Sequence, residues 1–275
     1  MAKKVGYLGP PGTFAEEAAL RHDPTATLVP LPSNGAVVAG VASGDTDEGV
    51  APVENSLEGA VNETLDTLIQ SERVFVRGEL VLAIEHCLIA APGARMEDVR
   101  LVMSHPQALA QCRAFLERHC PGARLEAALS TAAAVETALR TPGAAAIGTR
   151  RAAQLLGGAL LAEAIQDVAH NKTRFLVLGR SDAQPTGDDK TSIAFTVAHD
   201  RPGTLMAVLR ELADRQINLT RIESRPTRQD LGIYVFLVDF QGHREQPVVA
   251  EALRAVEEQA FYFRVLGSYP RFVES

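Results

Sequence analysis

The chain has 275 residues, a mass of 29.4 kDa and 46% hydrophobic residues, which is enough for one large domain or two ordinary ones. Its 27 Lys and Arg against 34 Asp and Glu give a net charge of −7, which argues against nucleic-acid or membrane partners. No apolar run reaches the roughly 18 residues that a spanning helix needs, and Gly9-Pro10-Pro11-Gly12 interrupts any signal-peptide core. We therefore expect a cytoplasmic protein that binds any anionic ligand through a few local groups.

Known metal and nucleotide motifs are missing from the sequence. The three cysteines are an odd number without a C-x-x-C pair, which is typical of reduced thiols. Cys112, His119 and Cys120 share one helical stretch without a second ligand pair, so we expect ordinary packing there and no metal. The glycines of Gly6–Gly12 match neither the dinucleotide fingerprint nor the P-loop, and no GxSxG elbow is present.

Short apolar runs alternate with helical periodicity over the first two thirds of the chain. Between two such runs, for example, apolar residues recur with helical spacing from Val61 to Ile69. The alternation predicts a mostly parallel α/β architecture. The predicted strands are Val5–Leu8, Gly49–Val53, Leu80–Ala90, Leu101–Met103, Ala144–Ile147 and Phe175–Leu178.

The polar segment Ser181–Asp189 has no periodicity and predicts a linker between a domain of residues 1–180 and one of residues 190–275. We expect the first domain to stand without the second, because such a linker carries no core. The second part shows the order β-α-β-β-α-β, which predicts a ferredoxin-like unit. Its predicted strands are Lys190–His199, Ile217–Ser224, Leu231–Phe240 and Phe261–Leu266, with helices at Leu205–Leu212 and Val248–Gln259.

Three helix-start patterns each follow the end of a predicted strand. Thr13, Asn55 and Ser104 each carry a side-chain oxygen and are followed three residues later by Glu or Gln, as in a capping box. In a parallel sheet these helix starts would share one edge, where backbone N–H groups and the positive helix dipole can bind an anion. Simple helix capping explains each pattern alone, but the three together predict a carboxylate-binding crevice.

The segment Asn171–Phe175 combines a hydroxyl, a guanidinium and an aromatic ring. Arg174 can bind a carboxylate through two parallel hydrogen bonds, and Thr173 can donate a hydrogen bond to a departing oxygen. Thr is a weak acid at neutral pH, so we assign it hydrogen-bond donation in the transition state. Taken alone, the same pattern is also typical of an edge strand anchored in a core.

Eight motifs follow one another along the chain. The first part contains GPPGTF (Gly9–Phe14), PVENS (Pro52–Ser56), SHPQALAQC (Ser104–Cys112), STAAA (Ser130–Ala134) and NKTRF (Asn171–Phe175). The second contains RPGTLMAVL (Arg201–Leu209), INLTRIESRP (Ile217–Pro226) and YVFLVDF (Tyr234–Phe240). In order and spacing, the first set resembles the prephenate dehydratase family, and the second resembles the ACT regulatory domain that this family carries.

The resemblance implies a monofunctional lyase without a cofactor, which converts prephenate to phenylpyruvate in L-phenylalanine biosynthesis. It implies two α/β lobes, as in a type II periplasmic binding protein, with the active site in the cleft. It also implies an ACT domain that binds L-phenylalanine as allosteric effector. Because small units with an exposed sheet edge commonly pair, we expect a homodimer or homotetramer.

The resemblance also assigns roles by position. Thr173 is expected to be catalytic. The expected substrate-binding residues are Thr13, Glu54, Asn55, Ser56, Ser104, Gln111, Thr131, Arg174 and Phe175. The expected effector-binding residues are Gly203, Thr204, Leu205, Met206, Asn218, Leu219, Glu223, Ser224, Arg225 and Pro226.

Two alternatives stay open at this point. Arogenate dehydratase acts on a substrate that differs only in an amino group replacing the side-chain keto oxygen. A non-catalytic amino-acid sensor could combine a binding-protein fold with an ACT domain. The intact segment from Asn171 to Phe175 favours the enzyme over the sensor.

Overall fold

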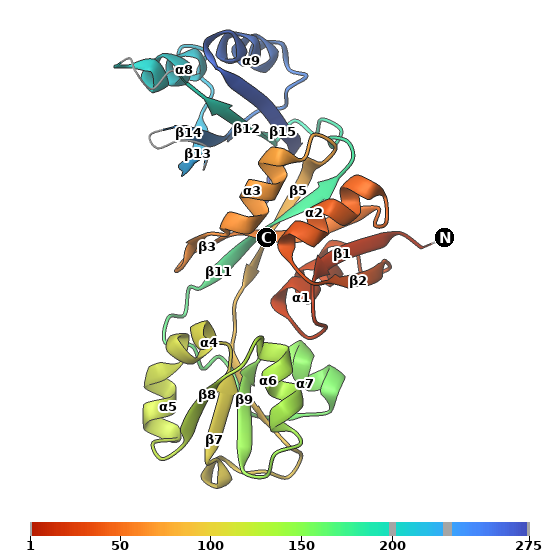
Figure 1. Ribbon diagram of the computed structural model, residues 1–275, viewed down its shortest axis with the longest axis vertical. Coiled ribbons are helices and arrows are strands. Elements are labelled where there is room, and N and C mark those ends of the chain that lie inside the picture. The colour runs from red at the N-terminus through yellow and green to blue at the C-terminus, as the bar shows by residue number, and fades with distance from the viewer. Residues whose placement is uncertain (1, 198–201, 228–232, 274–275) are drawn as a thin grey trace.

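The computed structural model describes residues 2–197, 202–227 and 233–273. Two α/β lobes and a C-terminal α/β unit follow one another along the long axis, with the first lobe in the middle (Figure 1). Within these described ranges no helix is long and apolar enough to cross a membrane.

The first lobe is built around a mixed sheet. Its strands are β1 (Lys4–Leu8), β2 (Thr27–Leu31), β3 (Glu48–Asn55), β4 (Gly59–Ala60), β5 (Phe75–Ala83) and β11 (Lys172–Gly179), and its helices are α1 (Phe14–His22), α2 (Asn34–Ser43) and α3 (Asn62–Gln70). The order is β2-β1-β3-β11-β5, with β4 paired to β3. β1 runs parallel to β2 and β3, but β11 runs antiparallel to both β3 and β5. The prediction of a mostly parallel sheet is therefore wrong, because β11 enters the sheet in the reverse direction on returning from the second lobe.

The second lobe has its own mixed sheet, in the order β10-β6-β9-β7-β8. Its strands are β6 (Cys87–Ala90), β7 (Leu101–Ser104), β8 (Arg124–Ala127), β9 (Ala144–Gly148) and β10 (Ala159–Ala162), and its helices are the 3₁₀ turn η1 (Met96–Asp98), α4 (Pro106–Gln111), α5 (Arg113–His119), α6 (Thr131–Ala138) and α7 (Arg150–Leu156). The single strand predicted over Leu80–Ala90 is thus two strands in two sheets. The polar pair Glu85-His86 lies where the chain crosses between the lobes.

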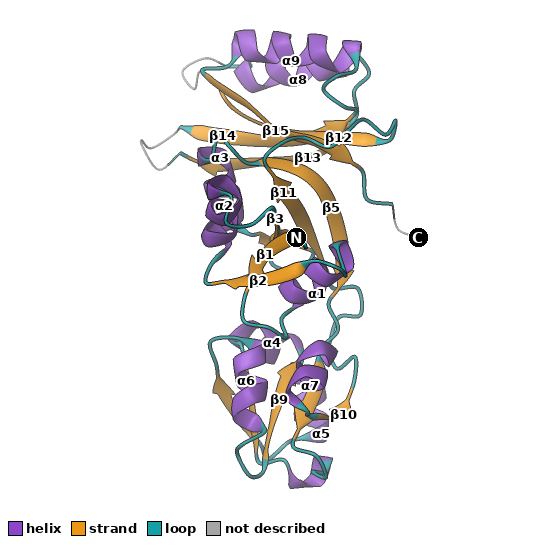
Figure 2. Ribbon diagram, turned by 90° about the vertical axis from the view of Figure 1, so that its right-hand side faces the viewer, coloured by secondary structure: helices purple, strands orange, loops and turns teal. Residues whose placement is uncertain are grey.

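The C-terminal unit has the predicted β-α-β-β-α-β order. It consists of β12 (Asp189–Thr196), α8 (Thr204–Ala213), β13 (Leu219–Pro226), β14 (Tyr234–Gln241), α9 (Pro247–Gln259) and β15 (Tyr262–Pro270). The sheet order is β13-β14-β12-β15, and both helices cover one face of the sheet (Figure 2). The ends of two predicted strands, at 198–199 and 231–232, lie outside the described residues.

The other face of this sheet packs directly on the first lobe. One hydrophobic core includes Leu65, Val76 and Leu176 from the lobe together with Leu237 and Leu266 from the C-terminal unit. β15 crosses β5 so closely that a Cβ atom at Gly267 would lie 2.0 Å from the backbone oxygen of Val76, which only glycine avoids.

The linker is tied into this interface. Ala183 packs against the shared core, and its backbone N–H donates to the Ser268 carbonyl oxygen at 3.2 Å. The Asp182 carboxylate accepts a hydrogen bond from the Ser268 N–H at 3.1 Å. The expectation that the linker carries no core is therefore wrong, because the linker lies where the small sheet packs on the first lobe.

We predict that Leu266→Ala lowers the free energy of unfolding by about 2–5 kcal/mol, because it opens a cavity in the shared core. The first lobe and the C-terminal unit should lose stability together in a urea titration. The exposed Leu155→Ala on α7 is the control, with a change of at most about 0.5 kcal/mol. A first lobe that unfolds at the wild-type midpoint in Leu266→Ala would contradict the prediction.

Candidate active site

A cavity of about 640 Å³ lies between the two lobes. Both lobes contribute its walls: the start of α1, the end of β3 and the start of β11 on one side, and the starts of α4 and α6 on the other. Its lining includes Thr13, Phe14, Asn55, His86, His105, Gln111, Ser130, Thr131, Asn171, Thr173 and Phe175.

Hydroxyl side chains cap two of the helix starts at this cavity. Thr13 caps α1, its Oγ1 accepting from the Glu16 N–H at 3.3 Å, as predicted. Ser130 caps α6, its Oγ accepting from the Ala133 N–H at 3.1 Å, and places Thr131 in the first turn. The capping-box criterion misses Ser130, since Ala133 stands where it requires Glu or Gln.

Ser104 does not cap a helix. It is fully buried at the end of β7, and its hydroxyl donates to the Ile147 carbonyl oxygen at 2.7 Å. The next residue, His105, is the cap of α4, with its Nδ1 3.3 Å from the Gln107 N–H. The prediction that Ser104 binds substrate is therefore wrong, because its side chain holds two strands together.

Asn55 begins a turn, where the sequence predicted a helix. Its Oδ1 accepts from the backbone N–H groups of Leu57 (3.0 Å) and Glu58 (3.1 Å), which fixes the orientation of the amide. Its Nδ2 therefore points the other way and donates to Thr173 Oγ1 at 2.9 Å. Since this oxygen acts as acceptor, and no described residue accepts the Thr173 proton, that proton is available to a molecule in the cavity.

A chain of amides continues from this pair to a buried histidine. Asn55 Nδ2 also donates to Asn171 Oδ1 at 2.8 Å, and Asn171 Nδ2 donates to Gln111 Oε1 at 3.1 Å. His86 Nε2 lies 3.0 Å from the same Gln111 oxygen and must carry the proton, because that oxygen can only accept. Sequence reasoning found Gln111 but missed Asn171 and His86 as site residues.

The surroundings of His86 favour its neutral form. Its ring is buried, and Phe14 packs against it edge-on at 5.5 Å between ring centroids. Burial lowers the pKa of His86 below its ordinary value, and the hydrogen bond to Gln111 only partly offsets this. Its Nδ1 has no partner among the described residues and is left as a buried acceptor.

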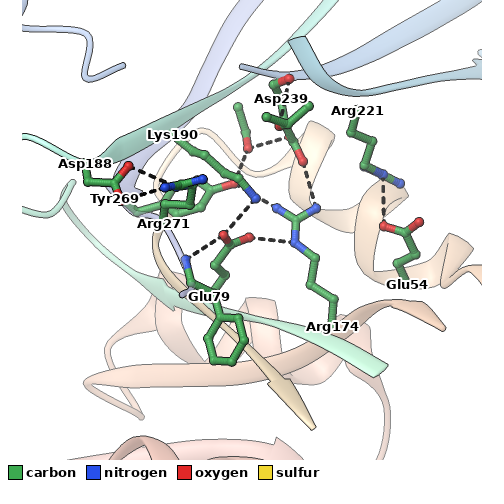
Figure 3. Close-up of polar contacts among 12 residues, drawn as sticks. Glu54, Glu79, Arg174, Asp188, Lys190, Arg221, Asp239, Tyr269 and Arg271 are labelled. Carbon is green, nitrogen blue, oxygen red and sulfur yellow. Dashed lines mark hydrogen bonds and ion pairs between the residues drawn. The ribbon is translucent and has the colours of Figure 1, made fainter. Parts of the chain in front are cut away.

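Arg174 does not reach the cavity. Neighbouring residues of a strand point to opposite faces, so Thr173 and Phe175 line the cavity while Arg174 points into the C-terminal unit. There the guanidinium contacts Glu79 at 2.7 Å and Asp239 at 2.8 Å (Figure 3). The prediction that Arg174 binds the substrate carboxylate is therefore wrong in this structure, because both carboxylates that it contacts belong to the protein.

Two other predicted substrate residues also lie outside the cavity. Glu54 precedes Asn55 on β3 and faces the C-terminal unit, with its carboxylate 3.4 Å from Arg221 Nε. Ser56 Oγ accepts from the Lys172 N–H at 2.9 Å and joins two crossing segments. Both predictions are corrected for the same reason: these side chains have partners within the protein and do not face the space between the lobes.

The predicted effector residues fall in two places. Gly203, in the left-handed region at φ 87°, caps α8 ahead of Thr204, Leu205 and Met206, and Met206 is exposed. Asn218 lines a hollow of about 440 Å³ next to β13, the strand that carries Leu219, Glu223, Ser224, Arg225 and Pro226.

The expectation that Arg225 binds the effector is wrong in this structure. Arg225 is 8% exposed and contacts Asp66 of α3 at 2.7 Å, so its charge serves the contact with the first lobe. In the described ranges no cluster of three or more His, Cys, Asp or Glu side chains is arranged to hold a metal ion.

Two family models match this chain, one over the two lobes and one over the C-terminal unit. The prephenate dehydratase family model matches residues 5–183, and the ACT domain model matches residues 191–258. The chain belongs to the prephenate dehydratase family. The resemblance drawn from the motifs is thereby confirmed: this is a lyase of that family with an ACT domain.

Individual relatives cover almost the whole chain. The prephenate dehydratase of Mycolicibacterium vanbaalenii is 40% identical over 284 residues, 97% of this chain and 90% of its own. The structure of the Arthrobacter aurescens enzyme, solved with L-Phe, has a TM-score of 0.90 at 36% identity and covers 98% and 90%. A protein described as a novel type of quorum-quenching acylase has a TM-score of 0.88 at 30% identity, covering 98% of both chains.

We predict that His86 makes stability fall with decreasing pH. Because its folded pKa is below the ordinary value of 6.5, the unfolded chain takes up the proton first, and folding stability falls as the pH drops below about 6.5. Between about pH 7.5 and pH 5.5, the Tm of His86→Gln should fall less than that of wild type. The exposed His119→Gln should follow wild type, and equal pH slopes in all three proteins would refute the prediction.

Proposed function

We propose that this chain converts prephenate to phenylpyruvate in the cavity between the lobes, with Thr173 as the hydrogen-bond donor to the departing hydroxyl. The observation that carries the proposal is the direction of one hydrogen bond, from Asn55 Nδ2 to Thr173 Oγ1. A donor on this oxygen makes the remaining O–H a better donor. It also leaves the proton directed at the ligand.

The reaction needs little more than binding and charge stabilisation. The C–C bond to the ring carboxylate breaks with loss of carbon dioxide, its electron pair enters the ring, and the ring C–O bond breaks with departure of hydroxide. Aromatisation supplies most of the driving force, so the protein must hold a dianion and stabilise the leaving oxygen. The N-termini of α1 and α6, each a helix of at least eight residues, provide backbone N–H groups for the carboxylates.

Three hydroxyl groups of the cavity, those of Thr13, Ser130 and Thr173, are not paired with a base and so favour dehydration over acyl transfer. An acylase needs a nucleophile whose proton is taken by a neighbouring base. Thr173 is bonded instead to an amide donor, the Thr13 hydroxyl donates to the Leu8 carbonyl oxygen, and Ser130 caps α6. An assay for phenylpyruvate from prephenate, repeated with arogenate and phenylalanine as product, tests the reaction and separates the two dehydratase substrates.

We further propose that the ACT domain binds L-phenylalanine, as the Arthrobacter aurescens relative does. The α8 start at Gly203–Met206 offers N–H groups to the effector carboxylate, and Asn218 supplies a polar group for the ammonium. Glu223 is left out of this proposal, because its carboxylate is paired with Arg221 and Arg225. β13 is the edge of its four-stranded sheet, a place where a second copy can pair. We therefore propose a homodimer or homotetramer of this cytoplasmic enzyme.

We predict that Thr173→Val lowers kcat by a factor that corresponds to about 2–4 kcal/mol and changes KM little, since it removes one donor to the departing oxygen. The matched control is Thr64→Val in α3, because Thr64 is equally buried and its hydroxyl has no partner among the described residues. Steady-state kinetics on both folded variants gives the comparison. Equal kcat values would remove Thr173 from the reaction.

We predict that Asn55→Asp is as damaging to kcat as Thr173→Val. The carboxylate would replace the donor with an acceptor, and the Thr173 proton would then point at residue 55 and away from the ligand. Asn55→Asp should also gain activity as the pH is lowered and the carboxyl is protonated, which wild type should not. An unchanged kcat at neutral pH would show that the donor direction is irrelevant.

A further inference from the structure

Two residues of the cavity and two residues of the domain interface lie on opposite faces of the sheet, on the neighbouring strands β3 and β11. Asn55 of β3 is paired in register with Thr173 of β11, and Glu54 with Arg174. Because strand residues alternate between faces, the first pair faces the cavity and the second faces the ACT domain. Each site residue is therefore joined to an interdomain residue by one peptide bond.

The ACT domain presents the complementary charges in the same arrangement. Arg221 of β13 and Asp239 of β14 are also register partners. Asp239 contacts Arg174 at 2.8 Å, and Arg221 contacts Glu54 at 3.4 Å. Two cross-strand pairs thus meet with opposite charges facing each other, as Figure 3 shows. We call these four residues the interdomain charge pairs.

The Arg174 half of this arrangement is rigid. Its guanidinium also donates to Glu79 at 2.7 Å and to the Tyr269 hydroxyl at 3.0 Å, so three directions are fixed. Asp239 is buried and accepts from Ser192 at 2.6 Å. Burial opposes its ionisation, but Arg174 and Arg221 outweigh that effect and hold the pKa of Asp239 below its ordinary value. A displacement of β14 would therefore have to move Arg174 or break a buried ion pair.

We propose that Arg174 and Glu54 are positioning residues, through which the ACT domain sets the geometry of Thr173 and Asn55. This inference rests on the proposed role of Thr173. It assigns the arginine of the Asn171–Phe175 segment to the link between the domains and leaves substrate binding to other groups. Effector binding that shifts β13 or β14 would reach the cavity through one residue on each of two strands.

The test is Asp239→Asn, which removes a charge but keeps the shape of the side chain. We expect kcat for phenylpyruvate formation to fall about ten-fold, KM to stay within about two-fold, and the response of activity to L-phenylalanine to shrink. Since Asp239 is buried, the second variant is Glu54→Gln, which weakens the more exposed pair with Arg221 and leaves the contact of Arg221 with Glu223 in place. It should give the same pattern with a smaller change in kcat.

The control is Asp66→Asn, which breaks a different contact between the same two domains. Its partner Arg225 is as buried as Arg174, but Asp66 lies on α3, away from the two strands that carry Asn55 and Thr173. Asp66→Asn should keep wild-type kcat and the L-phenylalanine response. Folded Asp239→Asn and Glu54→Gln enzymes that match Asp66→Asn in both measurements would overturn this inference alone. A wild-type protein that forms no phenylpyruvate would overturn the proposed function as well.

Discussion

The two-residue repeat of β3 and β11 is the constraint on which the site and its connection to the ACT domain both depend. These antiparallel neighbours place Asn55 opposite Thr173 on one face and Glu54 opposite Arg174 on the other. The register shifts immediately afterwards, between Arg174 and Phe175, yet Phe175 still lines the cavity. A slip of one residue would exchange the polar pair of the site with the charged pair of the interface.

The charged residues of this arrangement lose hydration because they lie between the first lobe and the ACT domain. Buried ion pairs contribute little net stability, since the loss of hydration offsets their attraction, but removing one partner is strongly destabilising. Glu79 is shared by Arg174 and Lys190, at 2.7 and 2.8 Å, so each charge of the cluster has an opposite neighbour. Stability comes instead from the apolar core that Leu237 and Leu266 share with the first lobe. The ion pairs then specify which relative position of the two units is allowed.

The sequence predicts helices, strands and motifs well, but it predicts less well on which face of a sheet a side chain lies. The cap at Thr13 and the order of the C-terminal unit are as predicted, because each depends on neighbours in sequence. The motif and the chemistry of a guanidinium predict that Arg174 binds the substrate carboxylate, yet neighbouring side chains on a strand lie on opposite faces. Its carboxylate partners, Glu79 and Asp239, are distant in sequence, and no local sequence pattern predicts these contacts. Ser104 fails for a related reason, since its acceptor, Ile147, comes from another strand.

The proposed role of Thr173 depends on the direction of one hydrogen bond and not on the fold. A relative described as an acylase shares this architecture over 98% of both chains, so the two-lobed fold cannot by itself specify the reaction. What differs between a nucleophilic hydroxyl and a donating one is whether the neighbour of its oxygen accepts or donates a proton. Here Leu57 and Glu58 fix the Asn55 amide, and that amide can only donate to Thr173. The backbone turn after β3 therefore fixes the direction of the hydrogen bond that the Thr173 hydroxyl on β11 receives.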